Sequence, residues 1–453
     1  MKNILKFIPI LSLALLISCP NTPVQTNTPN FVTSQSTSNE SIAFNVQVVD
    51  GQTKRILPNT KVEVIPVSIK SNIEPQNTDA DGFAQFNLIE NNFYNISVSA
   101  SEYIPIVKSL SISKSNNPLT IEIFKPNASI IGKVKNSDGN PVNSAIVQLG
   151  TDFAITDSNG IFEIYTLGSG SLQLSISKMG FEISKYNINV EKKLHKDIGS
   201  ISLKSTNLKP SILFETSKNP LGISKDEYIS RFKDLSDFLI QSGFDTEFND
   251  IGALKDSTDI VVITSPSLEY NENELKTLTD FVKKGKKVIV LGEWGGFGNF
   301  NINTANKFLA NANLKINQDL VKETSKLNYQ TSAEQVIISN FANNSITENI
   351  KNIVLYGSSS VDVLSGGINP LETNITKLIA FSSINSFRIK SSDIFKSFTE
   401  QQNALVAVSN IGLGKVIAMG DVSFLTNQDS NDDKTINLLE KDNKQFILNI
   451  LNW

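Results

Sequence analysis

The sequence predicts a multidomain protein in which two all-β domains are followed by an α/β domain. Three observations lead to this fold class. From about residue 41 to residue 206, apolar and polar residues alternate with the period of half-buried strands. A motif in this region recurs 78 residues later. Beyond residue 207, short apolar strands alternate with amphipathic helices, which is typical of a parallel sheet covered on both faces.

Composition limits the possible functions. A chain of 453 residues is too long for one hydrophobic core and should divide into about three domains. Its 41 basic and 45 acidic residues give a mildly negative charge, which argues against nucleic acid or anionic lipid as the partner surface. One cysteine and one histidine nearly exclude metal sites built on thiolate or imidazole ligands. We therefore expect no metal and no cofactor.

Residues 1–18 have the layout of an export signal. Lys2 and Lys6 form a basic region, residues 7–17 form an apolar stretch too short to span a bilayer as a settled helix, and Ser18 is small. Residues 16–19, Leu-Ile-Ser-Cys, resemble the bacterial lipobox. This resemblance implies that the Cys19 thiol receives diacylglycerol and that the signal peptide is then removed. The alternative is an ordinary secretory signal with a cysteine near its cleavage site.

The remaining N-terminal sequence fits a lipid anchor. An unpaired cysteine is a liability in an oxidising compartment, and a covalent lipid on Cys19 removes it. Residues 19–40 are rich in Pro, Thr, Asn and Ser, so they are predicted to be a disordered tether. We expect a protein of the cell envelope that the lipid on Cys19 attaches to a membrane, facing the periplasm or the cell exterior.

Residues 41–125 and 126–206 are predicted to be two related β-domains. Turns such as Asp50-Gly51 and Asp81-Gly82 separate strands of alternating pattern. The segment Thr78–Phe83 aligns with Thr156–Ile161 at the 78-residue spacing. The second copy resembles the carboxypeptidase-regulatory-like, transthyretin-like β-sandwich in Gly132–Val134, Asp138–Val142, Ala145–Leu149, Thr156–Phe162 and Lys178–Phe181. The first copy is divergent, since residues 54–58 replace the Gly-x-Pro turn.

The resemblance implies β-sandwich modules that act as spacers or binding platforms. Related sandwiches bind glycans through exposed aromatic residues, so Tyr94, Tyr103 and Tyr165 are either glycan-binding or packing residues. Asp79, Asp81 and Asp157 are either calcium ligands or turn-forming carboxylates. The turn interpretation is favoured because a glycine follows each turn.

Residues 207–453 follow the α/β pattern. The predicted strands are Ile212–Phe214, Ile260–Ile263 and Lys287–Leu291. A first helix follows the capping box Ser224–Glu227 and ends at Gly243, and the apolar residues on one face of it are Tyr228, Phe232, Leu235, Phe238 and Leu239. A second helix follows Asn271–Glu274 and ends at Gly285, and the apolar residues on one face of it are Leu275, Leu278 and Val282. Ligands of such sheets bind beyond the carboxyl ends of the strands.

Three segments of this domain, 274–292, 412–427 and 446–453, resemble a broad family with a class I glutamine-amidotransferase-like domain. That family includes accessory proteins of gliding and ABC-transport systems. The resemblance implies a flavodoxin-like α/β domain. In true amidotransferases the strand that corresponds to Val288–Leu291 leads into a cysteine elbow, later joined by a histidine. Because Cys19 is assigned to the lipid and His195 belongs to the preceding sandwich, we expect no catalytic residues and no enzyme activity.

The loop after this strand supplies the candidate site. Glu293 and Trp294 are expected at the loop tip, followed by Gly295 and Gly296, and the resemblance places Asp421 opposite them. The loop either forms a pocket for a ligand or partner, with Trp294 as a stacking face, or only covers the sheet edge. The sequence thus predicts a non-enzymatic, lipid-anchored envelope protein that binds a ligand, or a protein or glycan partner, through a degenerate amidotransferase-like domain. The alternatives are an envelope hydrolase that uses Glu293 and Asp421, or a glycan-binding protein that acts through the sandwiches.

Overall fold

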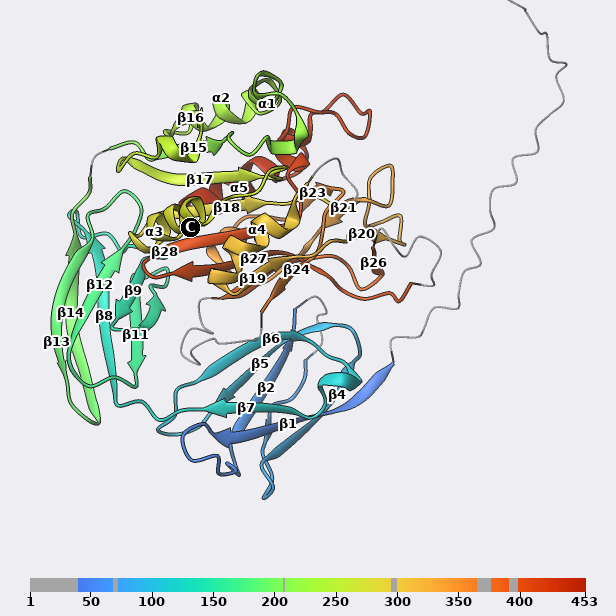
Figure 1. Ribbon diagram of the computed structural model, residues 1–453. Coiled ribbons are helices and arrows are strands. Elements are labelled where there is room, and N and C mark those ends of the chain that lie inside the picture. Colours follow the sequence, from blue (N-terminus) through green and yellow to red (C-terminus); the bar gives the residue numbers. More distant parts are fainter. Residues whose placement is uncertain (1–39, 68–71, 207, 295–299, 365–375, 391–397) are drawn as a thin grey trace, which may run out of the picture. The chain divides into compact units, whose positions relative to one another are not determined.

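The computed structural model describes residues 40–67, 72–206, 208–294, 300–364, 376–390 and 398–453 (Figure 1). The expected signal peptide, Cys19 and all but the last residue of the expected tether lie outside the described residues. Within these ranges, no helix has the length and apolar character needed to cross a bilayer.

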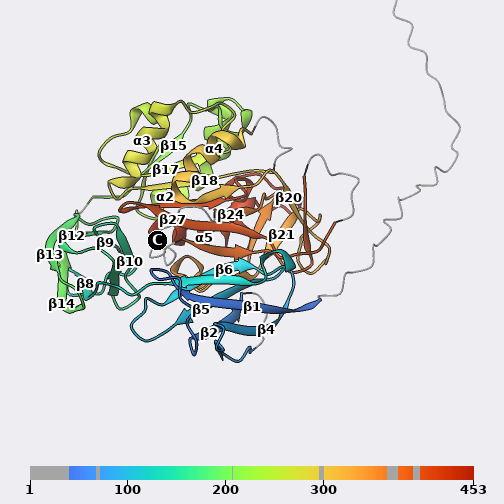
Figure 2. The same ribbon diagram turned by 60° about the horizontal axis from the view of Figure 1, so that its bottom comes forward.

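Residues 41–123 form two antiparallel-rich sheets that enclose a core. Their strands are β1 (Ser41–Asp50), β2 (Lys61–Pro66), β3 (Gln76–Asn77), β4 (Phe83–Ile89), β5 (Phe93–Ser99), β6 (Ile106–Ser111) and β7 (Leu119–Ile123). One sheet has the order β4-β1-β7 and the other β3-β2-β5-β6. Figure 2 shows β1 and β4 of the first sheet and β2, β5 and β6 of the second. Phe44, Val46 and Val48 are buried in the shared core, while the residues between them are more exposed. The apolar residues of the alternating pattern predicted from sequence therefore point into the core of the sandwich, and the polar residues between them point outward.

Residues 128–203 repeat this arrangement. The strands are β8 (Ala128–Asn136), β9 (Ile146–Leu149), β10 (Asp152–Ile155), β11 (Ile161–Thr166), β12 (Gly170–Ser177), β13 (Ser184–Val190) and β14 (Leu194–Leu203). Their sheet orders are β10-β9-β12-β13 and β11-β8-β14. Thr78 Oγ1 donates to Leu57 O at 2.6 Å, and Thr156 Oγ1 donates to Val142 O at 2.6 Å. The 78-residue repeat thus reappears as the same threonine bond in both sandwiches.

The rest of the chain is built around one eight-stranded sheet of order β16-β15-β17-β18-β28-β27-β25-β22. Its strands are β15 (Ser211–Glu215), β16 (Asp245–Asn249), β17 (Thr258–Thr264), β18 (Lys287–Leu291), β22 (Asn340–Phe341), β25 (Lys377–Phe381), β27 (Ala404–Ile411) and β28 (Gly414–Met419). Shorter strands are β19 (Leu314–Ile316), β20 (Leu320–Glu323), β21 (Gln335–Ile338), β23 (Ile353–Tyr356), β24 (Val361–Val363) and β26 (Ser386–Ile389). β16, β15, β17, β18 and β28 are parallel to their neighbours in this series.

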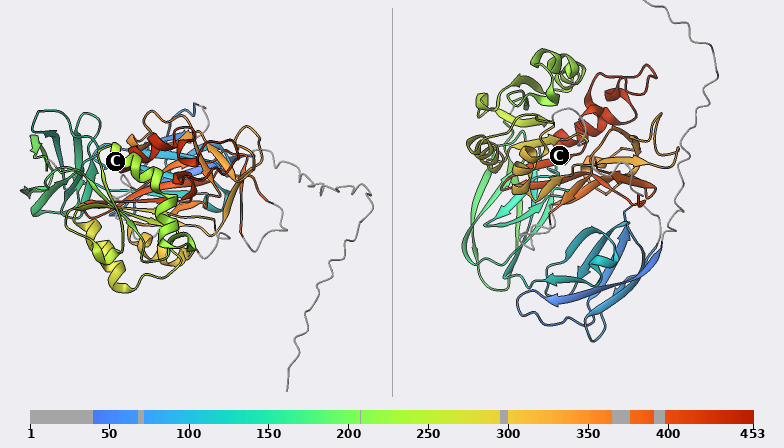
Figure 3. Two further views of the ribbon diagram at one scale, coloured as in Figure 1. Left: turned by 90° about the horizontal axis from the view of Figure 1, so that it is seen from above. Right: turned by 45° about the vertical axis from the view of Figure 1, so that its right-hand side comes forward.

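Helices cover both faces of this sheet (Figure 3). They are α1 (Lys225–Arg231), α2 (Lys233–Gln241), α3 (Glu272–Lys283), α4 (Ile302–Leu309) and α5 (Asn443–Asn452). Residues of α1, α2 and α5 share one buried cluster with Ile289 and Leu291 of β18. Residues of α3 and α4 share another with Val288 and Val290 of the same strand. Because successive strand residues point to opposite faces, the apolar run predicted for β18 is buried on both sides.

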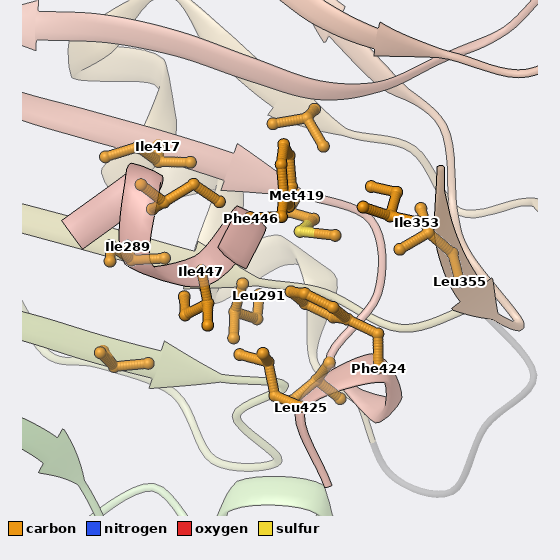
Figure 4. Packing of buried hydrophobic residues seen from close by; sticks show 14 of the residues in the cluster. Ile289, Leu291, Ile353, Leu355, Ile417, Met419, Phe424, Leu425, Phe446 and Ile447 are labelled. Carbon is orange, nitrogen blue, oxygen red and sulfur yellow. The ribbon is translucent and has the colours of Figure 1, made fainter. Parts of the chain in front are cut away.

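Helix α5 packs directly on the middle of the sheet. Figure 4 shows Phe446 and Ile447 of α5 beside Ile289 and Leu291 of β18, with Met419 at the end of β28. Each of these side chains is at most 2% exposed. Burying an apolar side chain of this size contributes roughly 1.5–3 kcal/mol, so α5 is a structural part of the domain.

Buried lysines bind the carboxyl end of α5. Lys287 Nζ donates to Ile450 O at 3.0 Å, and Lys415 Nζ donates to Trp453 O at 2.5 Å. Lys287 and Lys415 are opposite each other in the β18–β28 register, so both ammonium groups reach the same helix end. Burial lowers the pKa of both lysines well below its ordinary value. The last carbonyl groups of a helix have no partner within the helix and carry the negative end of its dipole. Their negative potential favours the charged form of the two lysines and so opposes the effect of burial.

Two predictions about this domain need correction. The first predicted helix is interrupted at Phe232, which separates α1 from α2. The sheet is also not wholly parallel, because β27, β25 and β22 join it in antiparallel pairs. A two-residue turn at Gly412 and Leu413 makes β27 and β28 a hairpin, and Gly412 adopts a positive φ of 59° there.

Candidate functional site

The predicted site residues lie where β18 and β28 end. These two strands are neighbours in parallel register, so their carboxyl ends meet at the same edge of the sheet. Glu293 comes two residues after β18, and Asp421 comes two residues after β28. Gly292 N, one residue after the end of β18, donates to Met419 O at 2.7 Å, so the two chain segments stay hydrogen-bonded beyond β18. The structure therefore brings Glu293 and Asp421 into one cluster.

Glu293 is buried, not exposed at a loop tip as the sequence suggested. Its relative exposure is 1%. One carboxylate oxygen accepts from Trp294 N at 3.2 Å, and the other lies 3.0 Å from Ser423 Oγ. Ser359 Oγ donates to the backbone oxygen of Glu293 at 2.9 Å. These contacts come from three separate segments, so Glu293 joins the loop after β18 to two others.

Asp421 is equally enclosed and anchors the backbone around it. Its relative exposure is 0%. Oδ2 accepts from Tyr356 N at 2.8 Å, and Oδ1 accepts from Ser423 N at 2.7 Å. Further backbone N–H groups at Val422 and Phe424 also stabilise the charged form. Asp421 thus fixes the turn after β28 and holds it against the end of β23.

Burial governs the acidity of this pair. It raises the pKa of Asp421 to about 7, although backbone N–H donors oppose the rise. Burial, and then the nearby charge of Asp421, raises the pKa of Glu293 well above its ordinary value. Two carboxylates close together in a low-dielectric site resist ionising together. Both effects act on Glu293, so it holds its proton to higher pH than an ordinary glutamate does.

Trp294 lies half-buried beside the carboxylates. Its backbone N donates to Gly357 O at 3.1 Å. A Cβ atom on Gly357 would lie 3.0 Å from Trp294 Cδ1 and 3.1 Å from Glu293 Oε1. Gly357 also has a positive φ of 77°, so a larger residue there would be strained. The remaining predicted residues, Gly295 and Gly296, lie outside the described residues.

The sequence interpretation missed the segment that closes this cluster. Ser358, Ser359 and Ser360 follow β23, and each is at most 1% exposed. Ser360 N donates to Asp319 Oδ1 at 2.8 Å, and Ser360 Oγ donates to Asp319 Oδ2 at 2.7 Å. A run of three serines that follows an apolar strand and Gly357 was the available signal. Their partners are dozens of residues away, which the local pattern does not reveal.

At the carboxyl ends of β15 and β17, which lie along the same edge of the sheet, a buried carboxylate also forms hydrogen bonds within the protein. Glu215, the last residue of β15, is 2% exposed. Its carboxylate accepts from Tyr270 OH at 2.9 Å and from Ser217 N at 2.7 Å. Burial, with the charge of Glu215, raises the pKa of the Tyr270 phenol well above its ordinary value. Glu215 therefore orders the loops after β15 and β17.

The described residues at this edge include neither a cysteine nor a histidine. The chain has one histidine, His195, and it lies on β14 of the second sandwich. Its Nδ1 is 2.8 Å from Ser129 Oγ of the neighbouring strand. The one cysteine, Cys19, lies outside the described residues. Directly after β18 the chain has Gly292 and Glu293.

The turn interpretation of the sandwich aspartates is confirmed at two positions. Asp79 Oδ1 accepts from Phe83 N at 2.8 Å, and Asp157 Oδ1 accepts from Ile161 N at 2.8 Å. Equivalent residues of the two repeats thus close the same turn. Among the described residues, no group of three or more metal-ligating side chains occurs.

The sandwich tyrosines do not form an exposed row. Tyr94 is 2% exposed, and its hydroxyl oxygen accepts from Ile89 N at 3.0 Å. Tyr103 OH donates to Asp50 Oδ2 at 2.7 Å. Tyr165 is half-buried, and burial together with Glu163 raises its pKa. Tyr94 and Tyr103 are packing and hydrogen-bonding residues of the first sandwich.

Comparison with known families gives one match. A family model described as a domain of unknown function, DUF4350, matches residues 232–451, just under half of the chain. The matched region runs from the break between α1 and α2 to the end of α5 and includes Glu293, Trp294 and Asp421. No curated protein matches the chain.

Several solved structures are similar at low identity. The mmIFT52 N-terminal domain is 16% identical, with a TM-score of 0.40, over 53% of this chain and 96% of that chain. The cytoplasmic protein STM1381 from Salmonella typhimurium LT2 is 11% identical, with a TM-score of 0.31, over 63% of this chain and 95% of that chain. A β-galactosidase from Rahnella sp. R3 is 10% identical, with a TM-score of 0.31, over 48% and 29%. Similarities at these TM-scores support no conclusion about function.

Proposed function

We propose that this protein is a non-enzymatic, lipid-anchored protein of the cell envelope. In this proposal, β-sandwich modules carry a degenerate, flavodoxin-like domain of the class I glutamine-amidotransferase type. That domain binds a ligand or partner through the surface beside Trp294. Cys19 carries the lipid, and residues 19–40 connect it to the first sandwich.

The observation that carries this proposal is the enclosure of Glu293 and Asp421. A general acid or base needs a free lone pair or proton that reaches substrate. Both oxygens of each carboxyl group contact donors of the protein itself, and neither residue is more than 1% exposed. The pair thus supports the loops that surround Trp294, which favours a binding surface over a catalytic one.

An envelope hydrolase is the second candidate function. Its specific support is that Glu293 and Asp421 lie together and that both pKa values are raised, since perturbed pKa values are frequent at catalytic sites. The enclosure described above weighs against it. In the hydrolase alternative, Glu293→Gln would abolish activity on envelope glycans or peptides. In our proposal, the same variant keeps the partner binding of the wild type.

Replacing Trp294 with alanine tests the proposed binding surface. We expect Trp294→Ala to lose the wild-type partners in quantitative affinity capture from the native envelope, by about tenfold or more, because a half-buried indole is a typical binding anchor. Trp294→Phe should retain part of the signal because it keeps an aromatic face. Leu327→Ala, at a side chain that is 87% exposed, is the control and should change nothing.

The outcome is read against the melting temperature of each variant. If Trp294→Ala melts like the wild type and captures the same partners in the same amounts, the surface beside Trp294 is not the binding site. If Trp294→Ala fails to fold, Trp294→Phe carries the comparison.

A serine at position 19 tests the anchor separately. We expect Cys19→Ser to lose incorporation of an alkyne-labelled fatty acid and to move from the membrane to the soluble fraction, since two or more acyl chains supply the attachment. Ser18→Ala keeps a small residue before the cysteine and should remain labelled. Continued membrane attachment of Cys19→Ser would refute the lipid anchor and leave the Trp294 surface untouched.

A further inference from the structure

The second sandwich has an edge strand, β10, that lines a cavity, and Asp152, Phe153 and Ala154 of this strand are buried. In its sheet of order β10-β9-β12-β13, β10 is an edge strand and pairs with β9. In the facing sheet, β11 is also an edge strand. Residues 153–158, Glu163 and Tyr165 line a cavity of about 750 Å³, whose opposite wall includes residues 343–345, 347 and 348. The volume is within the range of about 300–1,000 Å³ that ligand sites occupy.

The backbone direction of β10 follows from its hydrogen bonds. Thr156 N donates to Ala145 O at 3.0 Å, and Ser144 N donates to Thr156 O at 3.0 Å, so the polar groups of Thr156 point toward β9. In an antiparallel ladder this direction alternates along the strand. The N–H and C=O groups of Phe153 and Ile155 therefore point away from β9, toward the side of β10 that has no strand neighbour.

The cavity wall has an acidic character. Asp157, Glu163 and Glu348 line it, and Lys377 is the one basic residue among the described residues of the lining. All four of these residues are exposed. Ser144 Oγ lies 3.0 Å from Ser345 Oγ, so the two walls meet beside the start of β9. The cavity thus combines the side of β10 that has no strand neighbour, a closed end and a surplus of carboxylates.

We propose that this cavity binds an extended, basic segment of a partner protein as an additional strand beside β10. Backbone groups of Phe153 and Ile155 supply the ladder hydrogen bonds, and the carboxylates of Glu163 and Glu348 receive a lysine or arginine side chain. An edge strand with unpaired backbone groups is the usual template for such strand addition. This site is on the second sandwich, apart from the Trp294 surface, and does not depend on the function proposed above.

The test uses a phage-displayed library of random ten-residue peptides, selected on the mature chain. Ile155→Pro removes the N–H that points to the cavity, and edge strands tolerate proline where that group is not part of the ladder. Ile155→Ala is the matched control, since it loses the same side chain and keeps the N–H. Glu348→Gln and the distant Glu272→Gln test the charge.

We expect enriched peptides that carry lysine or arginine and bind wild type and Ile155→Ala alike. Their affinity should fall about tenfold or more on Ile155→Pro, and several-fold on Glu348→Gln but not on Glu272→Gln. A peptide strand pairs with β10 through the N–H groups of every second residue. N-methylation of that set of peptide residues should therefore abolish binding, and N-methylation of the other set should not. The proposal would be overturned if the enriched peptides lacked basic residues or if they bound Ile155→Pro as well as the wild type. It would also be overturned if selection on the wild type enriched no peptides beyond those that selection on Ile155→Pro enriches. So would self-association of the wild type that Ile155→Pro abolishes, because the occupant would then be a second copy.

Discussion

Gly420→Ala should destabilise the α/β domain by about 3 kcal/mol or more, because there is no room for a Cβ atom at this position. Such an atom would lie 1.8 Å from Ser359 O and 2.7 Å from Ser358 Oγ. Ser359 N donates to Gly420 O at 2.9 Å, so the two backbones are held in contact. Alanine would force them apart, lose this bond and shift the adjoining Asp421 out of its hydrogen bonds.

Differential scanning calorimetry measures this effect as the melting temperature of the transition that belongs to the α/β domain. A loss of 3 kcal/mol should lower it by roughly 6–12 °C for a domain of this size. The control is Gly252→Ala, since a Cβ atom there meets nothing within 4 Å. We expect that control to melt within about 1 °C of the wild type. Equal melting of Gly420→Ala and Gly252→Ala would show that the Ser359 segment yields without cost.

Local sequence signals predicted the elements whose causes are local. Asn271 Oδ1 accepts from Glu274 N at 3.0 Å, and Glu274 Oε2 accepts from Asn271 N at 2.8 Å, which is the capping box expected at the start of α3. Gly285 follows the helix with a positive φ of 90°, as a terminating glycine should. The period-two pattern likewise identified strands in both sandwiches, because every second residue of a strand points to the buried face and is therefore apolar.

The interruption at Phe232 and the hairpin of β27 and β28 could not be read in this way. Phe232 is fully buried and packs against Phe214 and Tyr228, with ring centroids 6.2 Å and 4.8 Å away. A helical pattern continues through such a residue, so tertiary packing decides where the backbone departs from it. β27 is apolar except for Ser409 and Asn410, and a buried run of that length does not reveal its direction.

The candidate site shows the same limit at the level of chemistry. The resemblance of residues 274–292 and 412–427 to the amidotransferase-like family placed Asp421 opposite Glu293. The sequence assigned Glu293 to an exposed tip because a glycine-rich loop follows it. Ser359 and Ser423 enclose Glu293, and Ser359 is 66 residues away in the chain. Exposure of a loop carboxylate is thus decided by whichever distant segment covers it.

The largest pH effect is expected at the same pair of carboxylates. The folded-state pKa values of Glu293 and Asp421 are raised, so the native protein holds protons that the unfolded chain releases. Below the unfolded pKa values, near 4, both states are protonated and the pair costs nothing. As pH rises toward the folded value of about 7 for Asp421, the unfolded state gains free energy from ionisation and the free energy of unfolding falls.

Glu293→Gln should remove much of this loss, since glutamine resembles the protonated acid. Its oxygen can still accept from Trp294 N, and its nitrogen can donate to Ser423 Oγ. We expect the variant to match the wild type within about 0.5 kcal/mol at pH 4.5 and to exceed it by about 1–3 kcal/mol at pH 8, measured by urea unfolding.

Asp421→Asn provides the contrasting variant for this measurement. Both oxygens of Asp421 accept from backbone N–H groups, and an amide nitrogen cannot accept, so this variant should be less stable than the wild type at both pH values. Parallel stability curves for wild type and Glu293→Gln between pH 4.5 and 8 would mean that Glu293 is already ionised in the folded protein. In that case the carboxylate would have to be accessible to water or to a ligand, and the argument for a purely supporting role of Glu293 would fail.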